Sequence, residues 1–209
     1  MKLLSKKEKA IFKSIKPTRK RAVSKFSIEK KDTWKVNRIP CEAFCQAQGL
    51  VKEKSFHDFR LGKRFFKELP EEMVDDDLIK LIIGVTKQIS VNEPRIKKMS
   101  LVVHHTEVFS YPDQLASNAP EGIHQDGMDY IVSALVIQRK NVLGGRSIIY
   151  SDDMRTRILE VELAAGQGIL QPDKNSILWH EVTSIESLDR ENLGTRSTLG
   201  FDFDVLELS

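Results

Sequence analysis

Residues 121–137 read EGIHQDGMDYIVSALVI, and this stretch decides the fold. His124 and Asp126 come first, and an apolar run from Tyr130 to Ile137 follows them. In an extended strand successive side chains point to opposite faces, so His124 and Asp126 share one face while Gln125 points away from it. Two potential ligands are therefore predicted to face the same metal ion.

A third potential ligand, His180, lies in the segment WHEV at residues 179–182, 54 residues after Asp126. A ligand from a distant strand would complete one face of an octahedron and leave three positions open. Two imidazoles and one carboxylate in this arrangement are typical of non-haem Fe(II) sites. A His-x-Asp tripeptide alone is a weak signal, because it also occurs as an ordinary hydrogen-bonded pair. Its interpretation depends on the strands around it.

The chain after residue 130 predicts short strands separated by turns. The run from Tyr130 to Ile137 is apolar on both faces, as in a strand that is covered on both sides. Gly144 and Gly145 interrupt the chain, and strands are also expected at 35–40, 100–109, 146–150, 157–163 and 177–184. Upstream, Pro70 and the glutamates after it are expected to begin a helix that ends near residue 92 and packs outside a sheet. A mainly β fold with flanking helices follows.

The last predicted strand carries a cation among apolar residues. Arg196 and Thr198 fall on one face, whereas Leu199 and Phe201 fall on the other. A buried guanidinium is costly without an anionic partner, and arginine can bind a carboxylate through two parallel hydrogen bonds. Arg196 comes 16 residues after His180 on what would be the next strand. Both side chains are therefore expected to face one cavity.

Together these motifs resemble the Fe(II)/2-oxoglutarate-dependent dioxygenase superfamily over about residues 100–208. The shared features are the His-x-Asp pair, the strand after it, the glycine pair, His180 in a Trp-His-x-Val setting, and Arg196 followed by Thr198. Their order and spacing are most similar to those of the bacterial free-amino-acid dioxygenases of the L-isoleucine type. The resemblance implies a double-stranded β-helix, which is a jelly-roll or cupin-like barrel, with N-terminal helices.

The resemblance also implies a ligand set and a reaction. His124, Asp126 and His180 would hold Fe(II). Arg196, helped by Thr198, would bind the far carboxylate of 2-oxoglutarate. The enzyme would then use O2 to hydroxylate a small molecule, a free amino acid or a related amine, while 2-oxoglutarate is decarboxylated to succinate.

Residues 104–107 are the candidates for substrate binding. The amino-acid dioxygenases tend to carry a His-Gln-x-Arg sequence in this strand, whereas this chain reads His-His-Thr-Glu. His104 and His105 must face opposite sides of a strand, so at most one of them faces the cavity. If His105 and Glu107 do, Glu107 could pair with an ammonium group of the substrate. The alternatives are a solvated Glu107 at the cavity mouth and histidines that only fill a core or an edge.

Charge is concentrated at the N-terminus. Residues 1–31 contain 12 lysines and arginines against two glutamates, in a chain with a formal net charge of +3. This segment is expected to be a basic arm or helix, with residues 32–209 as a single dioxygenase domain, since 209 residues rarely hold two full domains. A second helix is expected at residues 40–48.

The expected compartment is the cytoplasm. No apolar run reaches the 18 residues of a membrane span, and the N-terminus lacks the apolar segment of a secretory signal. Cys41 and Cys45, the two cysteines, are expected to remain thiols.

Two other functions fit parts of the sequence. The basic arm could bind nucleic acid or another acidic partner, although its cations lack the interleaved aromatic residues of single-strand binders. Alternatively, a cupin-like barrel could bind ligands without oxygenase activity. Arg196 argues against this reading, because a structural metal site has no need of a carboxylate anchor nearby.

Overall fold

A computed structural model describes residues 16–41, 50–51, 64–112, 114–189 and 191–209. Within these ranges the protein is mainly β, with one long helix. The larger sheet has six antiparallel strands in the order β10-β6-β13-β4-β1-β2. Their bounds are β1 Arg19–Lys30, β2 Trp34–Ile39, β4 Ile96–Ser110, β6 Tyr130–Lys140, β10 Leu170–Pro172 and β13 Gly194–Leu208.

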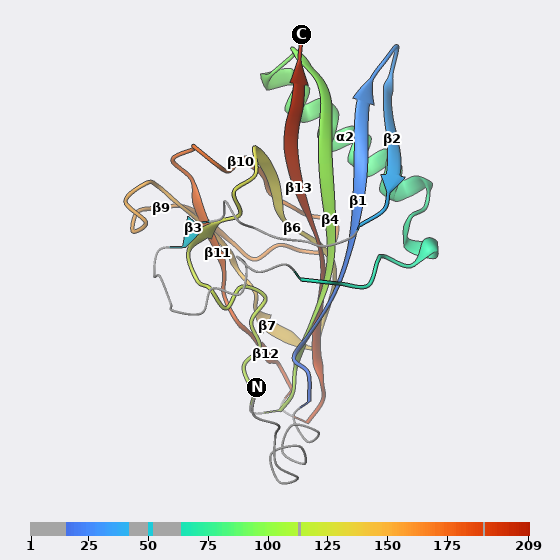
Figure 1. Cartoon of the computed structure of the whole chain (residues 1–209). Helices are drawn as coiled ribbons and strands as arrows, with labels where there is room; N and C mark the ends of the chain where they lie inside the picture. The colour runs from blue at the N-terminus through green and yellow to red at the C-terminus, as the bar shows by residue number, and fades with distance from the viewer. Residues whose placement is uncertain (1–15, 42–49, 52–63, 113, 190) are drawn as a thin grey trace, which may run out of the picture.

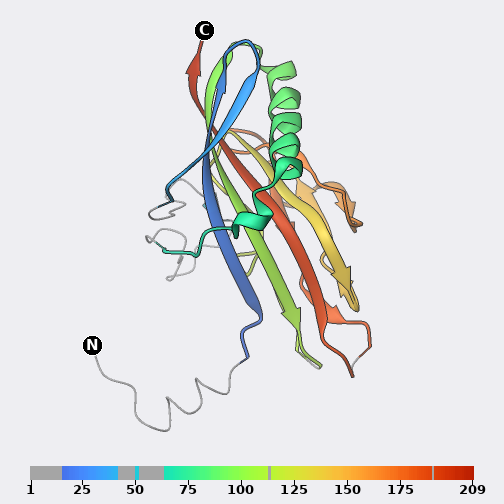
Figure 2. The same cartoon turned by 90° about the vertical axis from the view of Figure 1, so that its right-hand side faces the viewer.

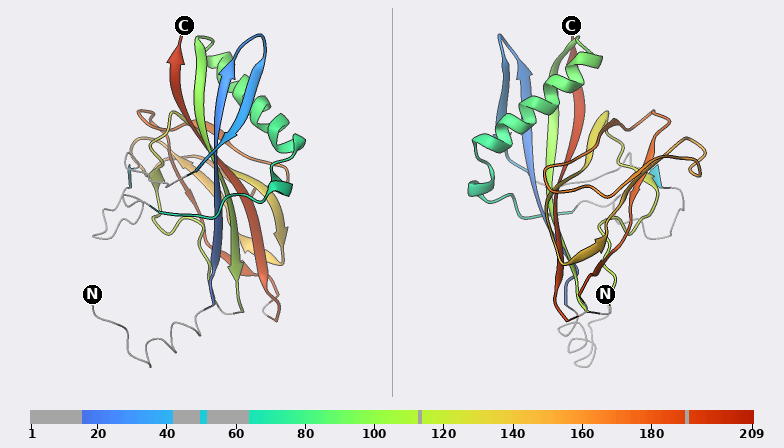
Figure 3. Two further views of the ribbon diagram at one scale, coloured as in Figure 1. Left: turned by 45° about the vertical axis from the view of Figure 1, so that its right-hand side comes forward. Right: turned by 180° about the vertical axis from the view of Figure 1, so that it is seen from behind.

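A smaller antiparallel sheet forms the second layer, in the order β3-β5-β11-β8-β9. Its strands are β3 Leu50–Val51, β5 His124–Gln125, β8 Ser147–Tyr150, β9 Arg157–Val161 and β11 Trp179–Val182. A ribbon of β7 Val142–Gly144 and β12 Ile185–Ser187 lies beside it. Two layers of antiparallel strands are the arrangement expected of a jelly roll. The larger sheet lies between the smaller sheet and helix α2 (Figures 1 and 3).

Helix α2, Asp76–Asn92, covers one face of the larger sheet near the C-terminal end of β13 (Figure 2). The carboxylate of Asp75 caps it by accepting hydrogen bonds from the backbone N–H groups of Asp77 and Leu78. The helix was expected to begin at Pro70, but a 3-10 turn at Glu71–Met73 comes first. The cap at Asp75 sets the true start. The end at Asn92 agrees with the prediction.

The main core lies between α2 and the larger sheet. Leu78, Ile82 and Ile89 form the buried stripe of the helix at helical spacing. They pack in one cluster with every second residue of the central strands, whose members are Phe26, Ile28, Met99, Leu101, Val103, Leu199, Phe201 and Phe203. The alternate residues of these strands therefore point the other way, toward the smaller sheet.

The expectation of a basic arm or helix over residues 1–31 is wrong for its second half. Residues 19–30 form β1, which pairs with β4 along most of its length. Phe26 and Ile28 are fully buried two residues apart, while Ser27 between them is not. A burial period of two residues is typical of a strand. The many lysines and arginines in this segment obscured that pattern in the sequence. Residues 1–15 and the helix predicted at 40–48 lie wholly or mostly outside the described residues.

The strands expected from the sequence are present as β2, β4, β6, β8, β9, β11 and β13. Among the described residues, no helix combines the length and the apolar character that crossing a bilayer requires.

We expect Ile82→Ala to lower the free energy of unfolding by about 2–5 kcal/mol, because the truncated side chain leaves a cavity in the core. Ile82 is 0% exposed, whereas Val91 in the same helix is 73% exposed. Val91→Ala should therefore change the stability by less than about 0.5 kcal/mol. Denaturant unfolding followed by circular dichroism measures both values. Equal losses in the two variants would contradict the assigned orientation of α2.

Candidate metal centre

His124, Asp126 and His180 meet at one point, as the sequence predicted. Each offers one possible ligand atom, and these atoms all lie within 4.8 Å of one another. Nε2 of His124 lies 3.7 Å from Oδ1 of Asp126, and Nε2 of His180 lies 3.4 Å from Oδ2. Both imidazoles are buried and the carboxylate is half-buried. Three donors thus face a common centre.

Strand pairing brings these donors together. His124 on β5 is the direct partner of His180 on β11, and the centroids of their rings lie 4.2 Å apart. Asp126 follows the last residue of β5, Gln125, and Gly127 then turns the chain with a φ of 86°. The strand is shorter than the predicted one, which was expected to contain Asp126. Asp126 nevertheless faces the same point as His124.

The second nitrogen of His124 fixes the orientation of its ring. Nδ1 of His124 donates to the carbonyl of Gly122 at 2.7 Å, which leaves Nε2 available to a metal. Nδ1 of His180 lies 4.0 Å from a carboxylate oxygen of Asp173, without a hydrogen bond among the described residues, and its Nε2 points to Asp126. Metal-binding histidines usually have such a partner on the other nitrogen.

The pKa values of Asp126 and His124 suit a divalent cation, whereas His180 has to give up a proton when a metal binds. Burial opposes ionisation of Asp126, but the hydrogen bond with His180 and the nearby imidazoles hold its pKa well below its usual range. Burial and the neighbouring His180 lower the pKa of His124. Burial also opposes protonation of His180, yet the hydrogen bond and charge of Asp126 outweigh it and raise its pKa. An ionised carboxylate and two imidazoles form a donor set for a first-row divalent metal.

Asp173 supports the centre, and sequence reasoning missed it. Its fully buried carboxylate accepts hydrogen bonds from the backbone N–H groups of Gly127 at 2.7 Å and Met128 at 3.0 Å. Burial and the charge of Asp126 raise the pKa of Asp173 to about 6. Asp173 therefore holds the turn after Asp126, and its other oxygen lies 4.0 Å from Nδ1 of His180. Only the folded chain brings it there, since it lies 46 positions after Gly127.

Arg196 lies on β13 with its guanidinium buried and 1% of its surface exposed. Nε and both terminal nitrogens have no hydrogen-bond partner among the described residues. Burial first, and then the charge of Arg139, lowers the pKa of Arg196 to about 10, although Glu162 opposes this shift. A Cβ on Gly145 would lie 2.9 Å from Cδ of Arg196, so the glycine makes room for this side chain. A buried, unpaired guanidinium fits a carboxylate ligand.

Thr198 shares a strand face with Arg196, as predicted. Its hydroxyl lies 3.5 Å from the carbonyl of Thr106, at the limit of a hydrogen bond. On this face Gly200 is the direct partner of His104 on β4, and a Cβ on Gly200 would lie 3.8 Å from that of His104. Arg196, Thr198 and His104 therefore line the side of the larger sheet that faces away from α2.

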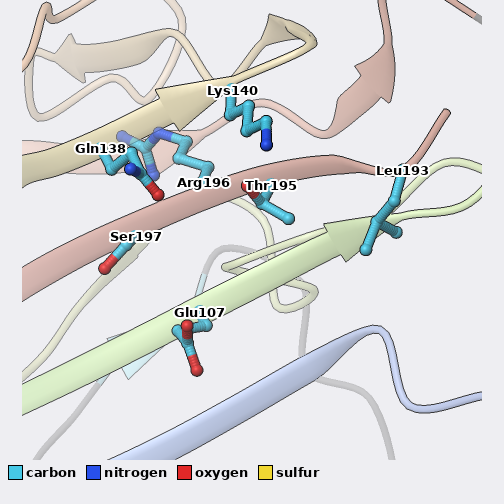
Figure 4. Close-up of a pocket in the computed structure, with 7 residues that line it drawn as sticks. All are labelled: Glu107, Gln138, Lys140, Leu193, Thr195, Arg196 and Ser197. Atoms are coloured by element: carbon cyan, nitrogen blue, oxygen red, sulfur yellow. The ribbon is translucent and has the colours of Figure 1, made fainter.

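The assignment of His105 and Glu107 to this cavity is wrong. Both lie on the opposite face of β4, where Nε2 of His105 lies 2.9 Å from the hydroxyl of Ser197. Figure 4 shows Ser197 and Arg196 pointing to opposite sides of β13. Glu107 is the direct partner of Ser197 and borders a surface depression of about 340 Å³, which Gln138 and Arg196 also line. Strand alternation separated the two histidines as expected, but it could not say which one faces inward.

His104 belongs to a second polar cluster that the sequence did not reveal. Its Nδ1 accepts a hydrogen bond from Arg21 on β1 at 2.9 Å, and its Nε2 donates to Asp202 on β13 at 2.8 Å. Burial and the charge of Arg21 lower the pKa of His104, in keeping with a neutral ring. The charge of Asp126 acts on both Arg21 and His104, so this cluster lies within electrostatic reach of the metal centre.

Comparison with known proteins identifies the family. The family model described as 2OG-Fe dioxygenase matches residues 9–202. The chain therefore belongs to the 2OG-Fe dioxygenase family, whose enzymes use Fe(II), 2-oxoglutarate and O2, and it carries a His-Asp-His triad suited to that metal. No curated protein sequence matches the chain.

Solved structures share the fold at low sequence identity. A bsmA homologue from Methylobium petroleophilum PM1 superposes with a TM-score of 0.72 at 17% identity, covering 92% of this chain and 73% of the other. The enzyme IDO from Bacillus thuringiensis gives 0.68 at 14%, with coverages of 91% and 76%. The Fe(II)/(alpha)ketoglutarate-dependent dioxygenase TqaL gives 0.59 at 15%, with coverages of 91% and 69%. At these identities the likeness concerns the fold alone.

Removing a ligand should abolish tight metal binding. We expect His124→Ala and Asp126→Ala each to weaken Fe(II) binding by about 100-fold or more, because even partners outside the ligand set contribute about 10–100-fold. Anaerobic equilibrium titration with Fe(II) measures this, and succinate production should disappear with it. His105→Ala, on the other face of the sheet, is the matched control and should bind Fe(II) normally. Full 2-oxoglutarate turnover in both ligand variants would refute the assignment.

Asp173→Ala should weaken metal binding by about 10–100-fold, because the turn after Asp126 loses its acceptor. Asp173→Asn keeps one oxygen that can accept from Gly127 and Met128, so most of the affinity should return. Titration with Mn(II), followed by its electron paramagnetic resonance signal, measures both variants. Equal losses in the two would show that the charge of Asp173 matters more than its hydrogen bonds.

Proposed function

We propose that this enzyme hydroxylates a small molecule, and that the substrate is a free amino acid or a related amine. One observation carries the proposal. Three donors for a metal lie together on the smaller sheet and the turn after it, and a buried guanidinium, Arg196, lies on the face of the larger sheet that points away from α2, with no hydrogen-bond partner among the described residues. A metal with open positions and a carboxylate anchor are what a bidentate 2-oxo acid requires.

The roles of the residues follow from their chemistry. His124, Asp126 and His180 would hold Fe(II) on one side and leave the other side to ligands. Arg196 would form two hydrogen bonds with the far carboxylate of 2-oxoglutarate, and the Thr198 hydroxyl, on the same strand face, would donate to the same group. When bound, Fe(II) and 2-oxoglutarate supply the O2-dependent oxidation of a C–H bond, with succinate and CO2 as the other products.

The burial of the site contributes to the chemistry. The two imidazoles, Arg196 and Asp173 are all buried, which excludes bulk water from the centre. In such an environment fixed charges act more strongly than in solvent. The protein thus positions the reactants and shields them.

The amino-acid class rests on one support, namely that the order and spacing of the motifs resemble those of the bacterial free-amino-acid dioxygenases. Glu107, first considered as the partner of an ammonium group, no longer contributes to this argument because it lies on the other face of the sheet.

The alternative functions have less support. A cupin-like binding protein without oxygenase activity would leave the buried charge of Arg196 unexplained. A nucleic-acid-binding arm loses part of its basis, since residues 19–30 are a strand within the sheet and Arg21 is bonded to His104.

Anaerobic addition of Fe(II) and 2-oxoglutarate should produce a metal-to-ligand charge-transfer band in the visible spectrum. In Arg196→Leu the 2-oxoglutarate concentration at half-saturation should rise by about 30-fold or more, since losing one partner of a buried ion pair costs about 2–5 kcal/mol. Fe(II) binding should stay nearly intact. Arg146→Leu, on the surface beside Glu160, is the control and should change neither value. Absence of the band in the wild-type protein would overturn the proposed function.

A further inference from the structure

The second polar cluster lies further along β13 than Arg196, on the same face of the larger sheet. Arg196 and Gly200 are four residues apart on β13, about 13 Å along a strand, and Gly200 is the direct partner of His104. Asp126 acts electrostatically on His104 and Arg21, whereas the charges that act on Arg196 are those of Arg139 and Glu162. If 2-oxoglutarate extends from the metal toward Arg196, the substrate has to occupy the side near His104.

We propose that Arg21 binds a carboxylate of the substrate, held in position by His104 and Asp202. This assignment rests on the proposed function and names the chemical class that the same site accepts, a small molecule with a carboxylate such as a free α-amino acid. The three residues come from three adjacent strands, β1, β4 and β13. They form one chain of hydrogen bonds across the wall of the cavity.

The hydrogen bonds give each residue a definite role. Arg21 donates to Nδ1 of His104, so the proton of a neutral ring lies on Nε2 and is donated to Asp202. Asp202 is buried and fixes the ring, and the ring fixes the guanidinium. An arginine held in one orientation loses little entropy on binding, and its planar fork matches a carboxylate.

A second support comes from the neighbouring segment at residues 64–67, which bridges to β1 through Ala22 and Lys67. The guanidinium of Arg21 lies over the ring of Phe66, 5.4 Å from its centroid. The guanidinium of Arg64 lies 5.6 Å from the same centroid. Phe66 thus makes a cation–π contact with each guanidinium, and its contact with Arg21 limits the motion of that side chain.

The chemistry of the cluster favours an anionic group over a cationic one. Arg21 lies close enough to the centre to interact with Asp126, whose negative charge a bound divalent metal would neutralise. Asp202 carries the opposite charge, but His104 already occupies its carboxylate. A carboxylate placed against Arg21 would also leave the rest of the substrate directed toward the metal.

The test uses the wild-type protein first. The charge-transfer band of the anaerobic Fe(II) and 2-oxoglutarate complex is recorded during titration with each of the twenty L-amino acids and with the carboxamide of each one that perturbs it. At least one amino acid should perturb the band. Its carboxamide should reach half of its effect only at a concentration about 30-fold higher, or should have no effect. Equal responses to acid and carboxamide would overturn the assignment and leave the proposed function intact. No response to any amino acid would overturn both the assignment and the proposed amino-acid substrate, while the band would still support binding of Fe(II) and 2-oxoglutarate.

Variants test the residue. In Arg21→Gln the unperturbed band should remain, but the half-saturating concentration of the responding amino acid should rise by about 30-fold or more. Arg21→Lys keeps the positive charge but loses the planar guanidinium, so its half-saturating concentration should lie between those of the wild type and Arg21→Gln. Lys20→Gln, one residue away on the opposite strand face and exposed, is the matched control and should behave as wild type. Unchanged amino-acid binding in Arg21→Gln, or loss of the Fe(II) and 2-oxoglutarate band itself, would overturn the role of Arg21.

Discussion

The pairing of His124 with His180 across β5 and β11 is the contact on which the rest of the site depends. Backbone hydrogen bonds fix this register, and so two residues that are far apart in sequence present their Nε2 atoms to one point. Asp126 then needs only a tight turn to join them, and Asp173 holds that turn through two backbone N–H groups. A short stretch of sheet and one buried carboxylate thus position three ligands that no local segment could bring together.

The two faces of the larger sheet have different roles, one in stability and the other in the functional site. One face of its central strands packs against α2 with apolar residues, and the other presents Arg196, Thr198 and His104 to the cavity. Because the side-chain period of a strand is two, a register shift of one residue would exchange the two faces. The apolar face makes such a shift costly, since Phe201 and Phe203 would leave the core. The packing against α2 therefore also protects the geometry of the site.

Much of the site could be predicted because its signals are local. The His-x-Asp spacing and the alternation around Arg196 depend only on strand geometry, and both predictions agree with the structure. The choice between His104 and His105 depends on which face of β4 packs against α2. A short stretch of sequence does not contain that information. Likewise β1 was hidden by its cations, and Asp173 acts only through long-range contacts. Arg21 was missed for both reasons: it lies on β1, whose many cations resembled a charged arm, and its partners His104 and Asp202 are distant in sequence.

Two arginines on one cavity wall create a problem of orientation, since 2-oxoglutarate has carboxylates at both ends. In a buried site each guanidinium attracts an anion strongly. The difference between the two lies in their partners. Arg21 donates a hydrogen bond to His104, which donates one to Asp202. The negative charge of Asp202 therefore offsets part of the positive charge of Arg21. Arg196 has no hydrogen-bond partner among the described residues, and the charge of Arg139 nearby is paired with that of Glu162. The dianion is therefore drawn to Arg196, and specificity arises from the difference between two cations rather than from either one alone.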